Sequence, residues 1–117
     1  MNIIYPGFGE IVVEGNVYDH DIVIEDGTVR PRDKKPSKPL ESQHGHTPLS
    51  ASEDIPWSKP RLIIGSGYSG RLPVLPEVRE TAREREVELI VVSTAEACAM
   101  LSDEEKTDVN AVLHVTC

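Results

Sequence analysis

The glycine-rich segment at residues 65–70 comes closest to a ligand-binding motif. Its sequence, Gly-Ser-Gly-Tyr-Ser-Gly, fits the pattern G-x-G-x-x-G and follows the apolar run Leu62–Ile64, which predicts a buried strand. In dinucleotide-binding folds this pattern leads directly into a helix that receives the pyrophosphate, and the next strand ends in an acidic residue. Here a proline-containing stretch intervenes before any helix, and Ser93 and Thr94 follow the next strand. We therefore predict no dinucleotide, and no other cofactor, at this segment.

A looser use of the same segment as an anion site remains open. Backbone amides of a glycine-rich loop can bind an anion, so Gly65, Ser66 and Gly67 are candidate ligand-binding residues. Residues 30–38 carry a net charge of +4 in an otherwise acidic chain and could attract a phosphate-bearing ligand. The candidate side chains are Lys34, Lys35, Lys38 and His46. The alternative is that the lysines belong to a solvated loop that aids solubility and the glycines form a tight turn.

The other reactive side chains do not form complete catalytic sets. Residues 67–70 lack the G-x-S-x-G spacing of a hydrolase nucleophile, and no suitable acid precedes His114 at a strand end. Cys98 lies on the apolar side of a predicted helix, where cysteine usually acts as a small hydrophobic residue. The pairs His44/His46 and His114/Cys117 offer four ligands of the kind Zn²⁺ prefers. Because H-x-x-C in a strand directs its two side chains to opposite faces, we predict no metal centre.

Composition excludes several classes of protein. A net charge of -8 over 117 residues argues against a general nucleic-acid-binding protein. The longest apolar run, Leu89–Val92, is far too short to span a membrane. Two cysteines cannot form a disulfide framework, which favours a reducing compartment. With no recognisable signal peptide, we expect the protein to be cytoplasmic.

Residues 1–30 are expected to form a small antiparallel β meander. Glu10–Val13 and Tyr18–Ile24 have the composition of strands, and Gly15-Asn16 and Asp26-Gly27 are typical turn dipeptides. Residues 31–60 hold six of the nine prolines, so neither helix nor central strand is expected there. The segment is predicted to be a long Pro/Lys-rich loop that lies on the domain, fixed by Ile55-Pro56-Trp57.

Residues 61–117 have the pattern of an α/β unit. After the strand at Leu62–Ile64, Pro76 suits the first position of a helix that continues to about Arg85. Leu89–Val92 is apolar throughout, as expected of a strand covered on both faces. Ser93 to Glu96 has the spacing of a capping box and should begin a second helix, and a last strand is expected over 111–116. These elements predict a single α/β domain over residues 1–117: a mixed β-sheet flanked by helices, with the N-terminal meander attached.

These motifs resemble a known family. The chain is similar to the small domain shared by the mitochondrial complex I assembly factor 3 protein and the adipogenesis-associated domain protein. The residues that carry the resemblance are Leu62–Gly67, Ser93–Ala97, Asn110–Cys117 and the meander from Gly15 to Ile24. The resemblance implies a single α/β domain without an established enzymatic activity, and eukaryotic members that act in protein assembly or regulation. Residues 31–57 depart from that pattern and resemble a prokaryotic branch.

Two hypotheses follow. The first is a non-catalytic intracellular domain that binds a protein partner or self-associates, with no role in nucleic-acid or membrane binding. The second is a small anionic-ligand binding protein or an enzyme, with its site where residues 65–70 meet the lysines of residues 34–38. A ligand site requires those lysines to fold toward the glycine loop, whereas a partner-binding domain does not.

Overall fold

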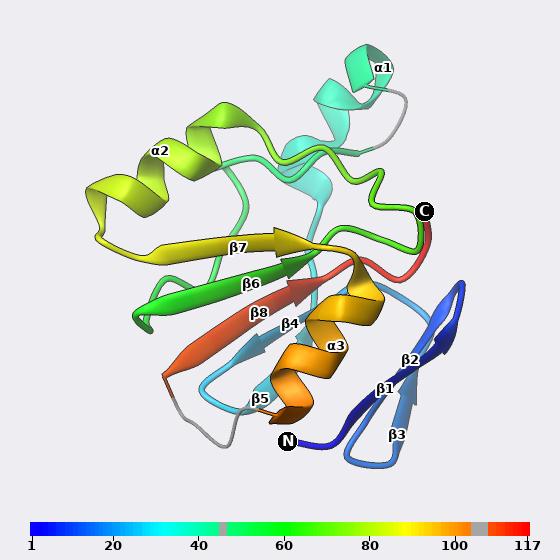
Figure 1. Cartoon of the computed structure of the whole chain (residues 1–117). Coiled ribbons are helices and arrows are strands. Elements are labelled where there is room, and N and C mark those ends of the chain that lie inside the picture. The colour runs from blue at the N-terminus through cyan, green and yellow to red at the C-terminus, as the bar shows by residue number, and fades with distance from the viewer. Residues whose placement is uncertain (45–46, 104–107) are drawn as a thin grey trace.

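The computed structural model describes residues 1–44, 47–103 and 108–117, which form two β-sheets and their helices (Figure 1). A three-stranded meander contains β1 (Ile3–Gly7), β2 (Glu10–Val13) and β3 (Asn16–Tyr18). The main sheet has the order β5-β4-β8-β6-β7. Its strands are β4 (Ile22–Glu25), β5 (Thr28–Pro31), β6 (Arg61–Gly65), β7 (Glu88–Val92) and β8 (Val109–Leu113). The helices are the 3₁₀ helix η1 (Lys35–Leu40), α1 (Glu41–His44), α2 (Pro76–Glu84) and α3 (Thr94–Asp103). The predicted α/β class with a mixed sheet is confirmed.

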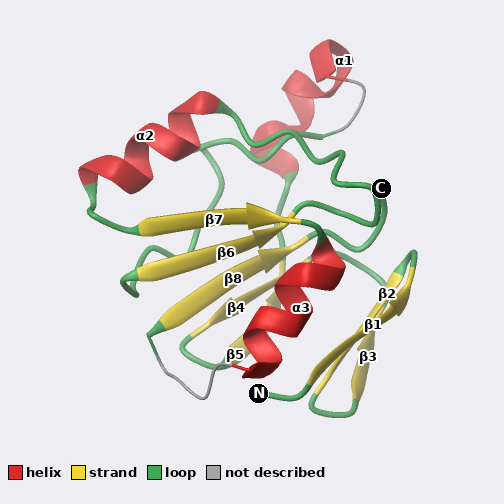
Figure 2. Cartoon of the chain, viewed as in Figure 1, coloured by secondary structure: helices red, strands yellow, loops and turns green. Residues whose placement is uncertain are grey.

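The strands that follow β6 along the chain are added on both sides of it in the main sheet. β6 is parallel to both β7 and β8, while β4 is antiparallel to β8 and β5. The chain passes from β6 through α2 to β7, and then returns through α3 to β8 on the other side of β6. The two helices therefore cover opposite faces of the sheet (Figure 2). The carboxyl ends of β6 and β8 meet at this switch point, which is where α/β sheets usually bind ligands.

The core has two layers, one on each face of the sheet. On one face, Ile63 and Leu113 pack with Ala97 and Leu101 of α3 and with the meander. On the other face, the buried side chains of β6 pack with α2; this layer includes Leu62, Ile64, Val78, Ala82 and Val112. Leu62, Ile63 and Ile64 are fully buried, so the short apolar run in the sequence marks the centre of the domain.

Both helix starts were predicted correctly. Pro76 lies in the first turn of α2, where its missing N–H costs no hydrogen bond. At the start of α3 the Ser93 hydroxyl accepts a hydrogen bond from the backbone N–H of Glu96 and donates one to the Glu96 carboxylate. This reciprocal pairing is close to the capping box that the spacing indicated.

The N-terminal region differs from the prediction. Only β1, β2 and β3 form the meander, whereas β4 and β5 belong to the main sheet. The predicted strand Tyr18–Ile24 is wrong, since it is interrupted at residues 19–21. The physical reason is that the Asp21 side chain is buried and accepts a hydrogen bond from the Val115 amide. The chain therefore does not continue there with side chains alternating between the two faces of a sheet. The β4–β5 turn at Asp26-Gly27 is confirmed, with φ of 52° and 78°.

The predicted position of Leu89–Val92 also needs correction. The strand exists as β7 and its side chains pack against the core layers on both faces, but it lies at the edge of the sheet, so these side chains are only half-buried. Its only strand neighbour in the described part of the chain is β6.

The segment 31–60 lies on the domain, as expected, but it is not free of helix. Pro36 occupies the first turn of η1, where a proline needs no donor, and α1 follows directly. Further along, Leu49 and Ile55 are buried in the α2-side core. Trp57 is half-buried, and the Arg85 guanidinium lies 5.9 Å from the centre of its ring. No helix among the described residues has the length and hydropathy to cross a bilayer.

We expect Ile63→Ala to lower the free energy of unfolding by about 2–5 kcal/mol, because Ile63 is fully buried at the centre of the sheet. Ile4→Ala, at a side chain that is 52% exposed, should change it by less than about 0.5 kcal/mol. Urea denaturation followed by circular dichroism measures both. Equal losses in the two variants would contradict the assigned core.

Candidate functional site

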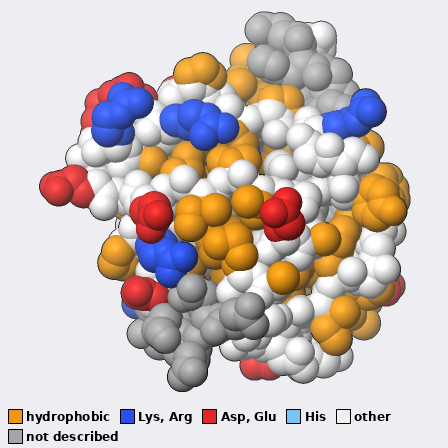
Figure 3. Space-filling view, in the orientation of Figure 1, with side chains coloured by type: hydrophobic (Ala, Val, Ile, Leu, Met, Phe, Trp, Pro, Cys, Tyr) orange, Lys and Arg blue, Asp and Glu red, His pale blue; other side chains and the backbone are white. Residues whose placement is uncertain are grey.

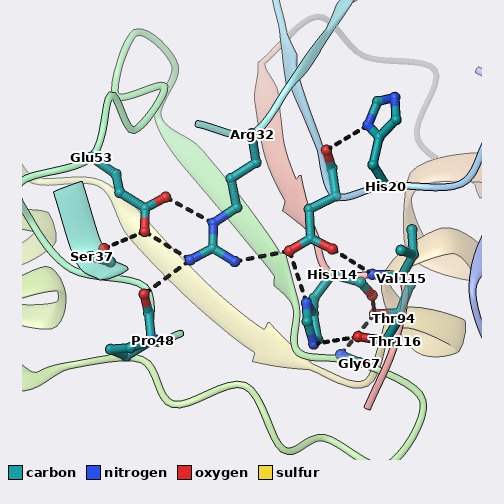
Figure 4. A network of polar contacts seen from close by, with 11 residues as sticks. His20, Arg32, Ser37, Pro48, Glu53, Gly67, Thr94, His114, Val115 and Thr116 are labelled. Atoms are coloured by element: carbon teal, nitrogen blue, oxygen red, sulfur yellow. Dashed lines mark hydrogen bonds and ion pairs between the residues drawn. The ribbon is translucent and has the colours of Figure 1, made fainter. Parts of the chain in front are cut away.

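A buried ionic network lies beside the switch point of the sheet (Figure 4). Its charged members are Arg32, Asp21, Glu53 and His114, whose side chains are each at most 9% exposed. They come from the segments around β4, β5 and β8 and from the loop before β6. The network therefore joins parts of the chain that are far apart in sequence.

Arg32 makes the central contacts of the network. Its Nε and Nη2 donate to the two Glu53 carboxylate oxygens at 2.8 and 2.7 Å, and its Nη1 donates to Asp21 Oδ2 at 2.9 Å. Nη2 also donates to the Pro48 carbonyl. Glu53 accepts a further hydrogen bond from the Ser37 hydroxyl at 2.5 Å, which attaches η1 to the network. Paired charges with this many hydrogen bonds can be buried without a large net penalty.

Asp21 connects the network to the end of β8. Its Oδ1 accepts a hydrogen bond from the Val115 amide at 3.0 Å, and its Oδ2 lies 2.8 Å from His114 Nδ1. His114 Nε2 lies 3.2 Å from the Thr116 hydroxyl. The Asp21 carbonyl also accepts the Arg32 backbone amide. Asp21 thus fixes both the orientation of the imidazole and the path of the chain after β8.

The network shifts the ionisation of its members. Burial acts to raise the pKa of Asp21, but the hydrogen bond and charge of His114, the Val115 amide and the charge of Arg32 outweigh it and lower the pKa to about 2. Burial acts to lower the pKa of Arg32, but Glu53 and then Asp21 raise it above its usual value. Asp21 and Arg32 are therefore both charged at neutral pH.

The order carboxylate, imidazole, hydroxyl is the one that activates nucleophiles in hydrolases. Here Asp21, His114 and Thr116 occupy those places. A hydrolase also needs free donors for the oxyanion of its intermediate. The backbone amides of the glycine-rich loop beside it already donate within the chain. The arrangement orients the chain after β8, and the described residues around it do not form a complete catalytic set.

The glycine-rich loop is filled by the protein's own backbone. The Tyr68 amide donates to the Thr116 carbonyl at 2.7 Å, and the Ser69 and Arg71 amides both donate to the Cys117 carbonyl. The remaining amides of residues 66–72 donate to Val92, Thr94, Gly67 and Ser66. The amides that would receive an anion are thus committed within the chain.

Gly67 and Thr94 explain how this packing is possible. Gly67 has a φ of +109°, and a Cβ at this position would collide with the Cys117 backbone, so only glycine fits. The fully buried Thr94 hydroxyl accepts the Gly67 amide at 2.8 Å and donates to the His114 carbonyl at 2.6 Å. Gly65 ends β6 tightly against Leu113 and Thr94, and the Ser66 hydroxyl donates to the Val92 carbonyl.

The cations predicted to gather at one site are divided. Arg32 is buried in the network, and Arg30 turns toward Glu25 and Asp54. Lys34, Lys35 and Lys38 lie on or beside η1, and Lys38 pairs with Glu41 at 3.9 Å. No hydrogen bond or ion pair within residues 1–44, 47–103 and 108–117 joins these lysines to residues 65–70. His46 and the His44 side chain lie outside the described residues. Anion binding at this loop remains a prediction.

The two cysteines have different surroundings. Cys98 lies on α3, is 3% exposed within the core, and burial raises its pKa to about 12. A thiol with that pKa stays protonated at neutral pH, so it packs as a small apolar group, as expected. Cys117 is half-buried beside the glycine-rich loop. The described residues contain no group of three metal ligands.

The meander has a buried inner face and an apolar outer face. Ile3, Ile11 and Val13 point into the core. On the outer face, Ile4, Val12 and Val17 are paired across the three strands and form one row, which we call the meander face. Ile4 is 52% and Val17 61% exposed. Hydrophobic atoms gather over the meander in the surface view (Figure 3).

The tip of the β1–β2 hairpin carries a further exposed aromatic side chain. Phe8 is 61% exposed and lies edge-on to Tyr68, which is 62% exposed, with ring centres 6.4 Å apart. Acidic side chains flank the meander face: Glu10 and Glu14 lie on either side of Val12, and Asp19 follows β3. Residues 1–29 contain no Lys or Arg. The surface is therefore apolar at its centre and negative at its rim.

Residues 4–114 match the family described as "Protein of unknown function (DUF498/DUF598)". The chain belongs to this family. No curated protein matches the chain. The link to the complex I assembly factor, which the sequence motifs suggested, is not part of what this match establishes.

Solved structures support the assignment. The conserved hypothetical protein PH1505 from Pyrococcus horikoshii OT3 is 29% identical, with a TM-score of 0.82, over 100% of both chains. A protein titled MT938 is 30% identical, with a TM-score of 0.71, over 94% of this chain and 93% of its own. An outer membrane protein from Bartonella henselae, 16% identical with a TM-score of 0.66 over 99% of this chain and 95% of its own, shows the same fold.

Sequence reasoning missed the ionic network. Asp21 was assigned no role, Arg32 was counted with the surface cations, and Glu53 and Thr94 were not singled out. A usable signal was present only for Arg32, which follows a proline at the end of a β-rich region. Its burial depends on partners 11 and 21 residues away, and no local pattern reveals them.

We expect the lowered pKa of Asp21 to appear as acid sensitivity. A carboxyl whose pKa falls from 3.8 to about 2 on folding stabilises the fold above pH 3.8, and that stabilisation is lost as the pH falls toward 2. Between pH 5 and pH 2 the wild type should lose about 2 kcal/mol more than Asp21→Asn. Urea titrations at a series of pH values measure this, and parallel curves would contradict it.

Arg32→Met should destabilise the fold by about 3–5 kcal/mol, because it leaves two buried carboxylates without their counter-ion. Lys35→Met removes the same kind of charge from an exposed position and should cost less than about 0.5 kcal/mol. Thermal and urea unfolding compare the two. Similar stabilities would show that the network is not the central constraint.

Proposed function

We propose that this protein is a non-catalytic protein-binding domain that recognises its partner through the meander face and the adjoining Phe8. The observation that carries the proposal is a row of apolar side chains across three paired strands, half or more exposed at both ends. Exposed apolar surface with a polar rim is typical of protein interaction sites. The expected partner is another protein, consistent with the assembly or regulatory roles implied by the family resemblance.

The charges around the meander face define the partner further. Glu10, Glu14 and Asp19 make the rim negative, and no cation within residues 1–29 neutralises it. A partner with an apolar centre and a rim of Lys or Arg complements both features. A second copy pairing through the same face would place acidic rims against each other, which disfavours self-association there.

The alternative function is the binding or conversion of a phosphate-bearing ligand by Gly65, Ser66, Gly67 and the lysines on or beside η1. It requires the backbone of Thr116 and Cys117 to leave the loop, since their carbonyls accept the loop amides. It also requires Lys34, Lys35 and Lys38 to approach that loop. The meander face needs no rearrangement, and we therefore favour it.

The double variant Ile4→Asp/Val17→Asp should abolish partner capture. Affinity-tagged wild type and variants are compared by quantitative mass spectrometry after capture from a lysate of cells that naturally contain the protein. The expected partner has a basic surface, is lost with the double variant, and is weakened more than tenfold by Glu10→Lys/Glu14→Lys through charge reversal.

Thr28→Asp is the matched control, because it adds a negative charge at an exposed position on the β4–β5 turn. It should retain capture. Equal enrichment of every partner with wild type, control and double variant would overturn the assignment of the meander face. Stabilisation by inorganic phosphate that is lost in Lys34→Ala/Lys35→Ala would support the ligand site instead.

A further inference from the structure

β7 presents an unpaired backbone edge. The Glu88 amide donates to the Pro60 carbonyl and the Val92 carbonyl accepts the Ser66 amide, so the backbone groups of these residues face β6. In a regular ladder alternate residues face opposite ways. The N–H and C=O groups of Leu89 and Val91 therefore point away from β6, to the side where the described part of the chain adds no further strand.

The other edge of the main sheet is protected, and β7 is not. β5 is short, ends in Pro31, and carries Arg30, which is ion-paired with Glu25 and Asp54. Proline, charge and short length are the usual means by which edge strands avoid pairing. β7 contains no proline, lysine or arginine, and four of its five residues are half-buried aliphatic side chains. Hydrophobic atoms are exposed along β7 between α2 and α3 (Figure 3).

We propose that β7 pairs with β7 of a second copy of this chain in antiparallel fashion, with a two-fold axis at Ile90. Leu89 of each copy then lies opposite Val91 of the other, and the outward N–H and C=O groups of these residues form four hydrogen bonds. Ile90 lies opposite its own symmetry mate. The two main sheets become one continuous sheet.

The side chains of β7 are self-complementary in this register. Leu89 and Val91 lie on the α2 face, and Ile90 and Val92 lie on the α3 face. Apolar side chains are therefore opposite one another on both faces, and the one charged residue of the strand, Glu88, is opposite Val92. No like charges are placed directly across the interface. The exposed residues of α2 carry both signs, so neighbouring copies of this helix present no single-sign repulsion.

An extended peptide from another protein would satisfy the same backbone groups. The symmetric register favours a second copy, because β7 itself supplies the apolar residues that are needed opposite one another on both faces. The pairing also leaves the meander, which packs against α3 and β8, outside the interface. The proposal is independent of the proposed partner-binding function, since different residues carry each.

A cysteine cross-link tests the register. Directly opposed residues of a non-hydrogen-bonded pair have Cα atoms about 4.5 Å apart, within the range of about 4.4–6.8 Å that a disulfide spans. Ile90→Cys, made in a Cys117→Ser background, should give a covalent dimer under mild oxidation. Leu89→Cys is the matched control, because its two copies lie diagonally, about 7–8 Å apart, and should remain unlinked.

Analytical ultracentrifugation, which measures the mass of the protein in solution, is the second test of the dimer. We expect a dimer mass for the wild type and a monomer mass for Ile90→Asp, which places two carboxylates opposite each other while circular dichroism remains unchanged. Thr28→Asp should remain dimeric. A wild type that is monomeric at all concentrations, or a dimer in which Leu89→Cys links as readily as Ile90→Cys, overturns the proposal. A stable complex with a foreign protein on β7 would assign the edge to that partner instead.

Discussion

The guanidinium of Arg32 is the constraint on which the arrangement of this domain depends. It neutralises two buried carboxylates from opposite directions, Asp21 before β4 and Glu53 before β6. Because a buried charge without its partner is far more costly than the pair, these segments cannot separate one at a time. The network thereby attaches the proline-rich stretch to the sheet, although that stretch contributes few apolar side chains. Through His114 it also fixes the chain that leaves β8.

The contact between Asp21 and His114 holds the chain after β8 beside the switch point of the sheet, and this limits which backbone groups are free there. In related architectures the loop after the first parallel strand is left open for a ligand. Here the chain after β8 crosses this loop, and its carbonyls accept the amides that a phosphate would use. Gly67 is needed for the close approach of the protein's own backbone. A motif that is typical of ligand loops in sequence therefore packs here against the protein's own backbone.

The contrast between what could and could not be predicted follows the range of the interactions. The buried run Leu62–Ile64, the proline start of α2 and the Ser93–Glu96 cap depend on residues close in sequence, and all three were predicted correctly. The break at Asp21 and the burial of Arg32 depend on partners between 11 and 94 residues away. From the sequence alone, a single polar residue in a β-rich region is therefore interpreted as a strand residue or as a surface charge. The edge position of β7 was missed for the same reason, since strand order is a property of the whole sheet.

The two uncovered apolar surfaces differ in a way that assigns them different roles. The meander face is surrounded by acidic side chains, which disfavour the pairing of two copies there and favour the basic partner that we propose. The edge of β7 carries one acid, which lies opposite an aliphatic residue in the proposed symmetric register, so this edge suits pairing with a second copy. Joined through β7, two copies would each keep a meander face free. A partner with two binding sites would then bind the pair more tightly than a single domain, by the gain in effective concentration and without any new contact. The proposed self-association and the proposed partner binding would in this way be complementary uses of one fold, separated by the sign and placement of a few carboxylates.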